Sequence, residues 1–125
     1  MAALNKNDAV AFQMPGGEVS DTAPARPIDL AHLARQTMGD RELEREVLSL
    51  FVDQVLSVRD QLAHADVKAR KQLAHSLKGS ARSVGAAAIG RCAEAIEENP
   101  ADRQAERRLS RLVDEVRDFI AAINR

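Results

Sequence analysis

One histidine of the chain stands among cationic residues at helical spacing. At about 100° per residue on an α-helix, one face of the segment carries Lys68, Lys71, His75, Lys78 and Arg82. The apolar residues of the same segment fall on the opposite face, so this cationic face is predicted to meet solvent. On spacing alone, a solvated surface with no further role is the alternative interpretation.

The cations bear on what the imidazole of His75 can do. Positive neighbours disfavour the imidazolium form, so the spacing predicts a neutral ring with a nucleophilic lone pair at neutral pH. A ring that accepts a phosphoryl group gains a charge of about −1.5 to −2. Lys78 and Arg82 follow one and two turns along the same face, where they would stabilise that charge. Such contacts are worth about 1 kcal/mol each, so they would assist a phosphoryl transfer rather than create it.

Gly79 follows His75 by four residues, so the two positions are neighbours on the predicted helix surface. A glycine inside a helix costs about 1 kcal/mol relative to alanine. The missing side chain would leave space for a partner to reach the imidazole. A packing adjustment is the alternative interpretation of this glycine.

Five helical segments are predicted from apolar periodicity and from start and stop residues. They span about 29–37, 40–62, 66–84, 86–98 and 102–123. The predicted N-caps are Asp29, Asp40 and Asp102, and the third segment begins near Asp66. Gly39, Gly85 and the Asn99-Pro100 pair are the predicted breaks.

The long segments are predicted to share one apolar core. Its positions are Leu43, Val47, Leu50, Phe51, Val55, Val58 and Leu62; Leu73, Ala74, Leu77, Ala81 and Val84; Ile89, Cys92, Ala93 and Ile96; and Ala105, Leu109, Leu112, Val113, Val116, Phe119, Ile120 and Ile123. Arg70 points toward the apolar arc, and its long side chain is predicted to extend out to solvent. The predicted fold class is all-α, an antiparallel four-helix bundle with a short additional N-terminal helix.

Composition excludes several classes of function. Residues 1–26 hold prolines and glycines without periodicity, which predicts a flexible tail before one domain at 27–125. A net charge of −1 and an aromatic content of 2% argue against a nucleic-acid partner. No apolar run is long enough to cross a membrane.

The single cysteine, Cys92, excludes an internal disulfide framework and a multi-cysteine zinc site. We expect no metal or cofactor on this chain, because metal-ligand spacings and the nucleotide motifs GxxxxGK[ST] and GxGxxG are absent. The first residues do not form the apolar region of an export signal, so a reducing cytoplasm is the expected compartment.

The run Ala74-His75-Ser76-Leu77-Lys78-Gly79-Ser80-Ala81, followed by Val84-Gly85-Ala86, resembles the signature of histidine phosphotransfer (HPt) domains of two-component relays. The resemblance covers about 28–124. It implies that His75 is the phosphoacceptor, that Lys78 is the cation near the phosphoryl group and that Gly79 provides clearance. Ala81 departs from the serine of many members.

The resemblance also implies a polar side chain near the imidazole from the following helix, and Glu97 occupies that position. An acidic group there would orient an imidazole N–H but would repel a phosphate. Lys68, Lys71 and Arg82 are expected to contact partners or to stabilise phosphate, and Arg82 is a cation that the family pattern does not require.

By this resemblance, the chain is expected to relay a phosphoryl group between aspartates of receiver domains through a phosphohistidine. Its partners would be response-regulator receiver domains and a (hybrid) histidine kinase, with Mg²⁺ bound by the receiver. We expect a monomer that acts as a carrier, and whether such a carrier counts as an enzyme is a matter of definition. Receivers are expected to dock on the exposed faces of the second and third of the five segments, 40–62 and 66–84, around His75.

Two other classes stay open. A non-catalytic helical interaction module would use the same bundle, with His75 incidental. The second alternative is a fragment of a histidine kinase, the part that dimerises and carries the phosphoacceptor. That class usually has an acidic residue directly after its histidine, and this chain has Ser76 there.

Overall fold

The computed structural model describes residues 26–124, which form five helices and no strand. The helices are α1 (Leu30–Gln36), α2 (Arg41–Leu62), α3 (Val67–Val84), α4 (Ala87–Glu98) and α5 (Arg103–Ile123). Each predicted segment corresponds to one of these helices, which confirms the all-α fold class. The tail predicted at 1–26 lies outside the described residues, apart from its last position.

Carboxylates at the helix starts explain where four of the helices begin. The side chains of Asp29, Asp40, Asp66 and Asp102 each accept a hydrogen bond from the backbone N–H three residues later. Such caps satisfy donors that the first helical turn leaves free, and each typically contributes about 1 kcal/mol. The predicted N-caps are therefore confirmed.

Gly85 ends α3 with a φ of 87°, in the left-handed region that favours glycine. A Cβ added at this position would lie 3.0 Å from the carbonyl oxygen of Asp29. The N–H of Asp29 in turn donates to the carbonyl oxygen of Gly85 at 2.9 Å. Gly85 thus allows the chain to change direction between α3 and α4. The absence of a side chain there also lets the backbone of Asp29, at the start of α1, pack closely against it.

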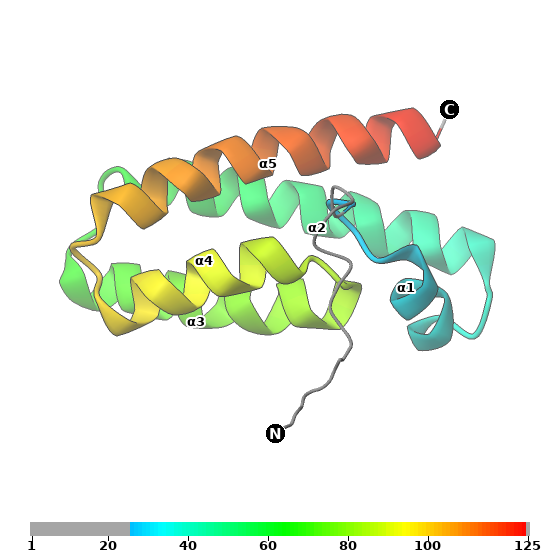
Figure 1. Cartoon of the computed structure of the whole chain (residues 1–125), viewed down its shortest axis with the longest axis horizontal. Helices are drawn as coiled ribbons and strands as arrows, with labels where there is room; N and C mark the ends of the chain where they lie inside the picture. Colours follow the sequence, from blue (N-terminus) through cyan, green and yellow to red (C-terminus); the bar gives the residue numbers. More distant parts are fainter. Residues whose placement is uncertain (1–25, 125) are drawn as a thin grey trace, which may run out of the picture.

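Helices α2 to α5 form the bundle, in which each helix packs on the next and α5 returns to pack on α2 (Figure 1). The short α1 lies near one end and packs on α3. One core runs through the bundle and closes within a single chain. Its largest fully buried members are Ile28, Leu33, Leu48, Leu62, Leu77, Ile89, Ile96 and Leu109, and the predicted core residue Cys92 is buried with them.

The predicted core face of α2 is partly wrong. Leu50 is 65% exposed and Leu43 is 41% exposed, whereas Leu48, which the periodicity did not select, is 2% exposed. Helix α2 carries apolar residues over a wider arc than its neighbours α3 and α5 cover. Periodicity alone does not show which edge of such an arc is buried. Ile123, in the last turn of α5, is likewise 39% exposed.

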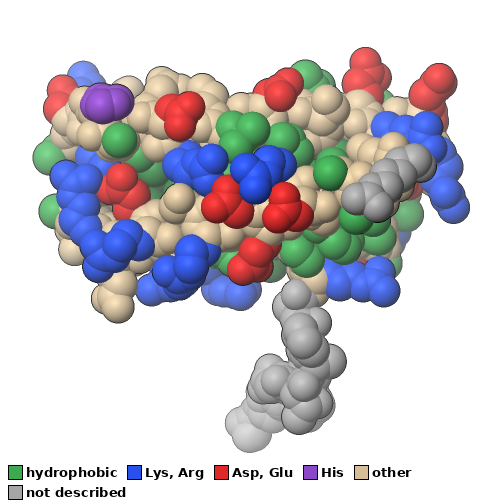
Figure 2. All heavy atoms as spheres, turned by 90° about the horizontal axis from the view of Figure 1, so that it is seen from above, with side chains coloured by type: hydrophobic (Ala, Val, Ile, Leu, Met, Phe, Trp, Pro, Cys, Tyr) green, Lys and Arg blue, Asp and Glu red, His purple; other side chains and the backbone are tan. Residues whose placement is uncertain are grey.

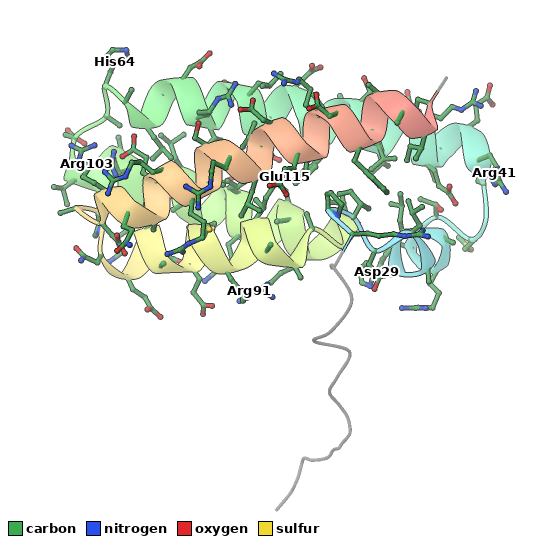
Figure 3. All side chains as sticks on the ribbon, turned by 45° about the horizontal axis from the view of Figure 1, so that its top comes forward. Asp29, Arg41, His64, Arg91, Arg103 and Glu115 are labelled. Carbon is green, nitrogen blue, oxygen red and sulfur yellow. The ribbon has the colours of Figure 1, made fainter. Side chains whose placement is uncertain are left out.

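The prediction that Arg70 extends to solvent is also wrong, because this residue is only 3% exposed. Its guanidinium donates to the carbonyl oxygens of Leu62 and Pro100, both at 2.6 Å, and to Oε1 of Glu106 at 2.8 Å. The end of α2, the α4–α5 loop and the first turns of α5 meet here, at the end of the bundle where Arg103 is labelled in Figure 3. Acceptors from these three segments satisfy the buried charge.

Glu106 belongs to the same cluster and also accepts a hydrogen bond from Arg103 at 2.9 Å. Partial burial by itself would raise the pKa of Glu106, but the hydrogen bonds from Arg70 and Arg103 outweigh it. The pKa therefore lies below its ordinary value. The carboxylate stays ionised at neutral pH and pairs with the buried guanidinium.

The face of the molecule that Figure 2 shows carries, among its described residues, no large patch of a single charge. On the side of the bundle seen from above, acidic and basic side chains are interspersed (Figure 2). No helix in the described part of the chain is both long and apolar enough to cross a bilayer.

Candidate functional site

The imidazole of His75 projects from α3 into solvent, with its side chain 70% exposed. Gly79 lies one turn further along, and a Cβ added there would meet no atom within 4 Å. Packing within the chain therefore does not require glycine at this position. The structure leaves the space beside the imidazole open to a molecule from outside.

Glu97 reaches this imidazole from α4. Its Oε2 lies 2.7 Å from Nδ1 of His75, and its Oε1 lies 2.6 Å from Nζ of Lys78. The hydrogen bond from Lys78, followed by that from His75, holds the pKa of Glu97 below its ordinary value, against an opposing effect of desolvation. One ionised carboxylate thus joins the two residues of α3.

The carboxylate also decides which ring nitrogen of His75 carries a proton. An ionised carboxylate only accepts hydrogen bonds, so Nδ1 must donate. In the neutral ring, Nε2 is then unprotonated and keeps its lone pair. The site therefore presents an oriented, solvent-exposed nitrogen nucleophile.

A family model for the Hpt domain matches residues 42–124, which include nearly all of α2 and the whole of α3 to α5. The chain belongs to the Hpt domain family. No curated protein and no solved structure matches it. Hpt domains take part in phosphotransfer in two-component signalling, where they interact with receiver domains and histidine kinases. The resemblance noted in the sequence is thereby confirmed.

The cationic face of this Hpt domain differs from the prediction. Lys78 is only 20% exposed at its side chain because it pairs with Glu97, and Arg82 pairs with Glu94 at 3.4 Å. Both glutamates belong to α4, so the charge pattern of α3 considered by itself does not include them. His75 therefore has cations on its own helix and also a carboxylate from α4, Glu97, at the position where the resemblance implies a polar side chain.

Lys68 and Lys71, on the other side of His75 along α3, remain exposed. Within residues 26–124, neither has an ion-pair partner at 4.0 Å or less. The structure thus brings His75, Lys78 and Glu97 into one hydrogen-bonded group and leaves the two lysines outside it. Among residues 26–124, these two lysines are therefore cations without a carboxylate partner, and they lie toward the start of α3.

Two shallow hollows follow the boundary between α2 and α3. One, of about 420 Å³, is lined from α3 by Gly79, Ser80, Ser83 and Val84, and from α2 by Val47, Leu50, Phe51 and Gln54. The other, of about 700 Å³, is lined by Ala69, Gln72, Leu73 and Ser76 and by Asp60, Gln61, His64 and Ala65. His75 directly precedes Ser76, the lining residue of the second hollow that is nearest along α3 to the first hollow. Leu50, which periodicity assigned to the core and which is exposed, lines the first of these hollows.

Glu94 is the participant that the sequence analysis missed. It stands three residues before Glu97, so both fall on neighbouring positions of one face of α4. Two glutamates on one face of α4 and two cations on one face of α3 are the sequence signal that would have indicated an ionic contact between the two helices. The sequence alone does not show that the two faces meet.

Proposed function

We propose that this Hpt domain carries a phosphoryl group on Nε2 of His75, between the aspartates of two receiver domains. The observation that supports this most directly is the hydrogen bond from Nδ1 to Glu97, which leaves Nε2 unprotonated on an exposed helix face. Gly79 supplies the clearance that an approaching active site needs. Lys78, which shares Glu97 with the imidazole, would be the cation that meets the phosphoryl charge.

In the transfer step, the lone pair of Nε2 attacks the phosphorus of an aspartyl phosphate. The N–P bond forms as the P–O bond to the aspartate breaks, and the electron pair leaves with the aspartate carboxylate. The proton of His75 stays on Nδ1, where it remains hydrogen-bonded to the carboxylate of Glu97. Passage to a second aspartate is the reverse of this step.

The receiver would supply the aspartate, the Mg²⁺ ion and most of the charge stabilisation. Docking would use the α2–α3 surface, with Leu50 as an exposed apolar contact. Lys68 and Lys71 would attract the acidic site of a receiver. We propose that the chain works as a monomer, because its core closes within one chain, and in the cytoplasm, where a lone thiol such as Cys92 stays reduced.

The test is phosphotransfer from a panel of phosphorylated receiver domains to wild type and to His75→Gln. We expect an acid-labile label on the wild type and none on His75→Gln. Arg111→Gln is the control and should keep its label, since Arg111 is exposed on α5 and lines neither hollow of the α2–α3 surface. Equal labelling of wild type and His75→Gln would refute the proposal and favour the non-catalytic interaction module.

A further inference from the structure

Helix α4 neutralises the two cations that follow His75 along α3. Glu97 holds Lys78 at 2.6 Å, and Glu94 holds Arg82 at 3.4 Å. The first pair is the better protected, with both side chains 20% exposed, whereas Arg82 and Glu94 are 58% and 44% exposed. Only the first pair includes the imidazole. The resting site therefore has its nearest cation already bound to a carboxylate.

A phosphoryl group on Nε2 changes this balance. It adds a charge of about −1.5 to −2 to the ring that shares Glu97 with Lys78, and Glu97 stays ionised on the Nδ1 side of the ring. Lys78 then has two competing anionic acceptors. Each negative group weakens the hold of the other on the lysine, and the two repel one another.

We infer that Glu97 is a positioning residue that keeps the phosphohistidine short-lived, because it retains Lys78 and holds the proton on Nδ1. This inference rests on the proposed function of His75 and concerns the regulation of that site. It makes the protein a carrier that passes its phosphoryl group on quickly rather than one that stores it.

The chemistry of the N–P bond explains the effect of the retained proton. When the bond breaks, the electron pair returns to Nε2. If Nδ1 carries a proton, the ring leaves as a neutral imidazole, whereas a ring without that proton would leave as an anion. A carboxylate that keeps Nδ1 protonated therefore eases departure of the phosphoryl group to water or to a receiver aspartate.

The experiment uses the whole chain and prepares the phosphohistidine with phosphoramidate, which transfers its phosphoryl group to the ring and releases ammonia. Its half-life at pH 7 is followed by ³¹P NMR. Glu97→Gln keeps the shape of the side chain and removes its charge, and we expect a half-life about fivefold longer than that of the wild type. Glu94→Gln removes the other carboxylate of the same face and should leave the half-life unchanged.

Equal half-lives for wild type and Glu97→Gln would overturn the inference, and so would equal lengthening in Glu94→Gln. Neither result would affect the outcome of the phosphotransfer experiment with receiver domains, which tests the role of His75. Conversely, failure of every receiver to label the wild type would refute the relay role while the lifetime comparison still stood. The two failures are therefore distinguishable.

A second measurement tests the competition for Lys78 directly. Lys78→Met is expected to shorten the half-life more in the Glu97→Gln background than in the wild type, because only there is the ammonium free to bind the phosphoryl group. In ¹⁵N NMR of the unphosphorylated protein, the ammonium signal of Lys78 should shift in Glu97→Gln and not in Glu94→Gln. Additive effects of the two substitutions, or an unshifted signal, would contradict the inference.

Discussion

Two ionic clusters on α3 use the same kinds of side chain in opposite ways. In the first, Arg70 has a side chain that is 4% exposed and donates to two backbone carbonyls as well as to Glu106. In the second, Lys78 is 20% exposed, and its acceptor Glu97 is shared with an imidazole that is 70% exposed. Along the helix, Arg70 precedes His75 and Lys78 follows it.

The difference lies in what would have to move to break each contact. The carbonyls around Arg70 belong to packed segments, so the guanidinium cannot lose them without opening that end of the bundle. Lys78 is held by a side chain, which can rotate while the helices stay in place. A cation held by buried backbone acceptors therefore supports the fold, whereas one held only by a side chain beside an exposed imidazole is free to exchange partners.

Arg70→Met is expected to give the largest change in stability. It removes the donor to two carbonyls and one of the two donors to Glu106, and breaking such a buried pair costs about 3 kcal/mol. Urea unfolding followed by circular dichroism measures this loss. Arg111→Met, at an exposed position of α5, is the control and should change the free energy of unfolding by less than about 0.5 kcal/mol. Equal losses from the two variants would remove the distinction between buried and exposed clusters.

Substitution of Gly79 should separate function from stability. Since an added Cβ meets nothing, Gly79→Ala is expected to raise the free energy of unfolding by about 0.5–1 kcal/mol. Gly79→Gln, which places a longer side chain beside the imidazole, should slow phosphotransfer from a receiver at least about tenfold. Stopped-flow or gel-based transfer rates, set beside urea unfolding of the same variants, provide the comparison. An unchanged transfer rate in Gly79→Gln would show that the open space is not used.

The pH dependence of stability should differ between the two glutamates, and this is the smallest expected effect. The pKa of Glu106 is lower in the folded protein than its ordinary value of 4.5, so the group stabilises the fold above that pH. This contribution is lost as the pH falls through the lowered pKa. Glu106→Gln should therefore reduce the drop in unfolding free energy between pH 7 and acid conditions, as measured by urea titration at each pH.

Glu97→Gln is the matched variant for that titration. Its carboxylate also has a lowered pKa, but the pairs it forms lie at the surface, where solvent screens them. We expect it to alter the acid dependence of stability less than Glu106→Gln does. A larger effect from Glu97→Gln would mean that the exposed cluster, rather than the buried one, supports the fold.

Much of this architecture was predictable because it depends on local rules. Asp29, Asp40 and Asp102 cap their helices through contacts that span three residues, so the chain order alone reveals them. The exposure of His75 follows from the same helical periodicity. The motif from Ala74 to Ala81 led to the family that the match over 42–124 confirms.

The errors arose where a side chain meets another element. Leu50 and Leu48 are both apolar residues of α2, and only the positions of α3 and α5 decide that the second is buried. Arg70 was expected in solvent because its acceptors come from residues that are eight to thirty-six positions away in the chain. No periodicity within one helix contains that information.

The site shows the same division. Helical geometry places His75, Lys78 and Gly79 on one face of α3, and this follows from their spacing in the chain. The pairing of Glu97 with both His75 and Lys78 depends on how α4 packs against α3, across a separation of about twenty residues. Spacing along a helix determines which groups share a face, but only packing between helices determines which charges those groups meet, because electrostatic contacts depend on distance in space.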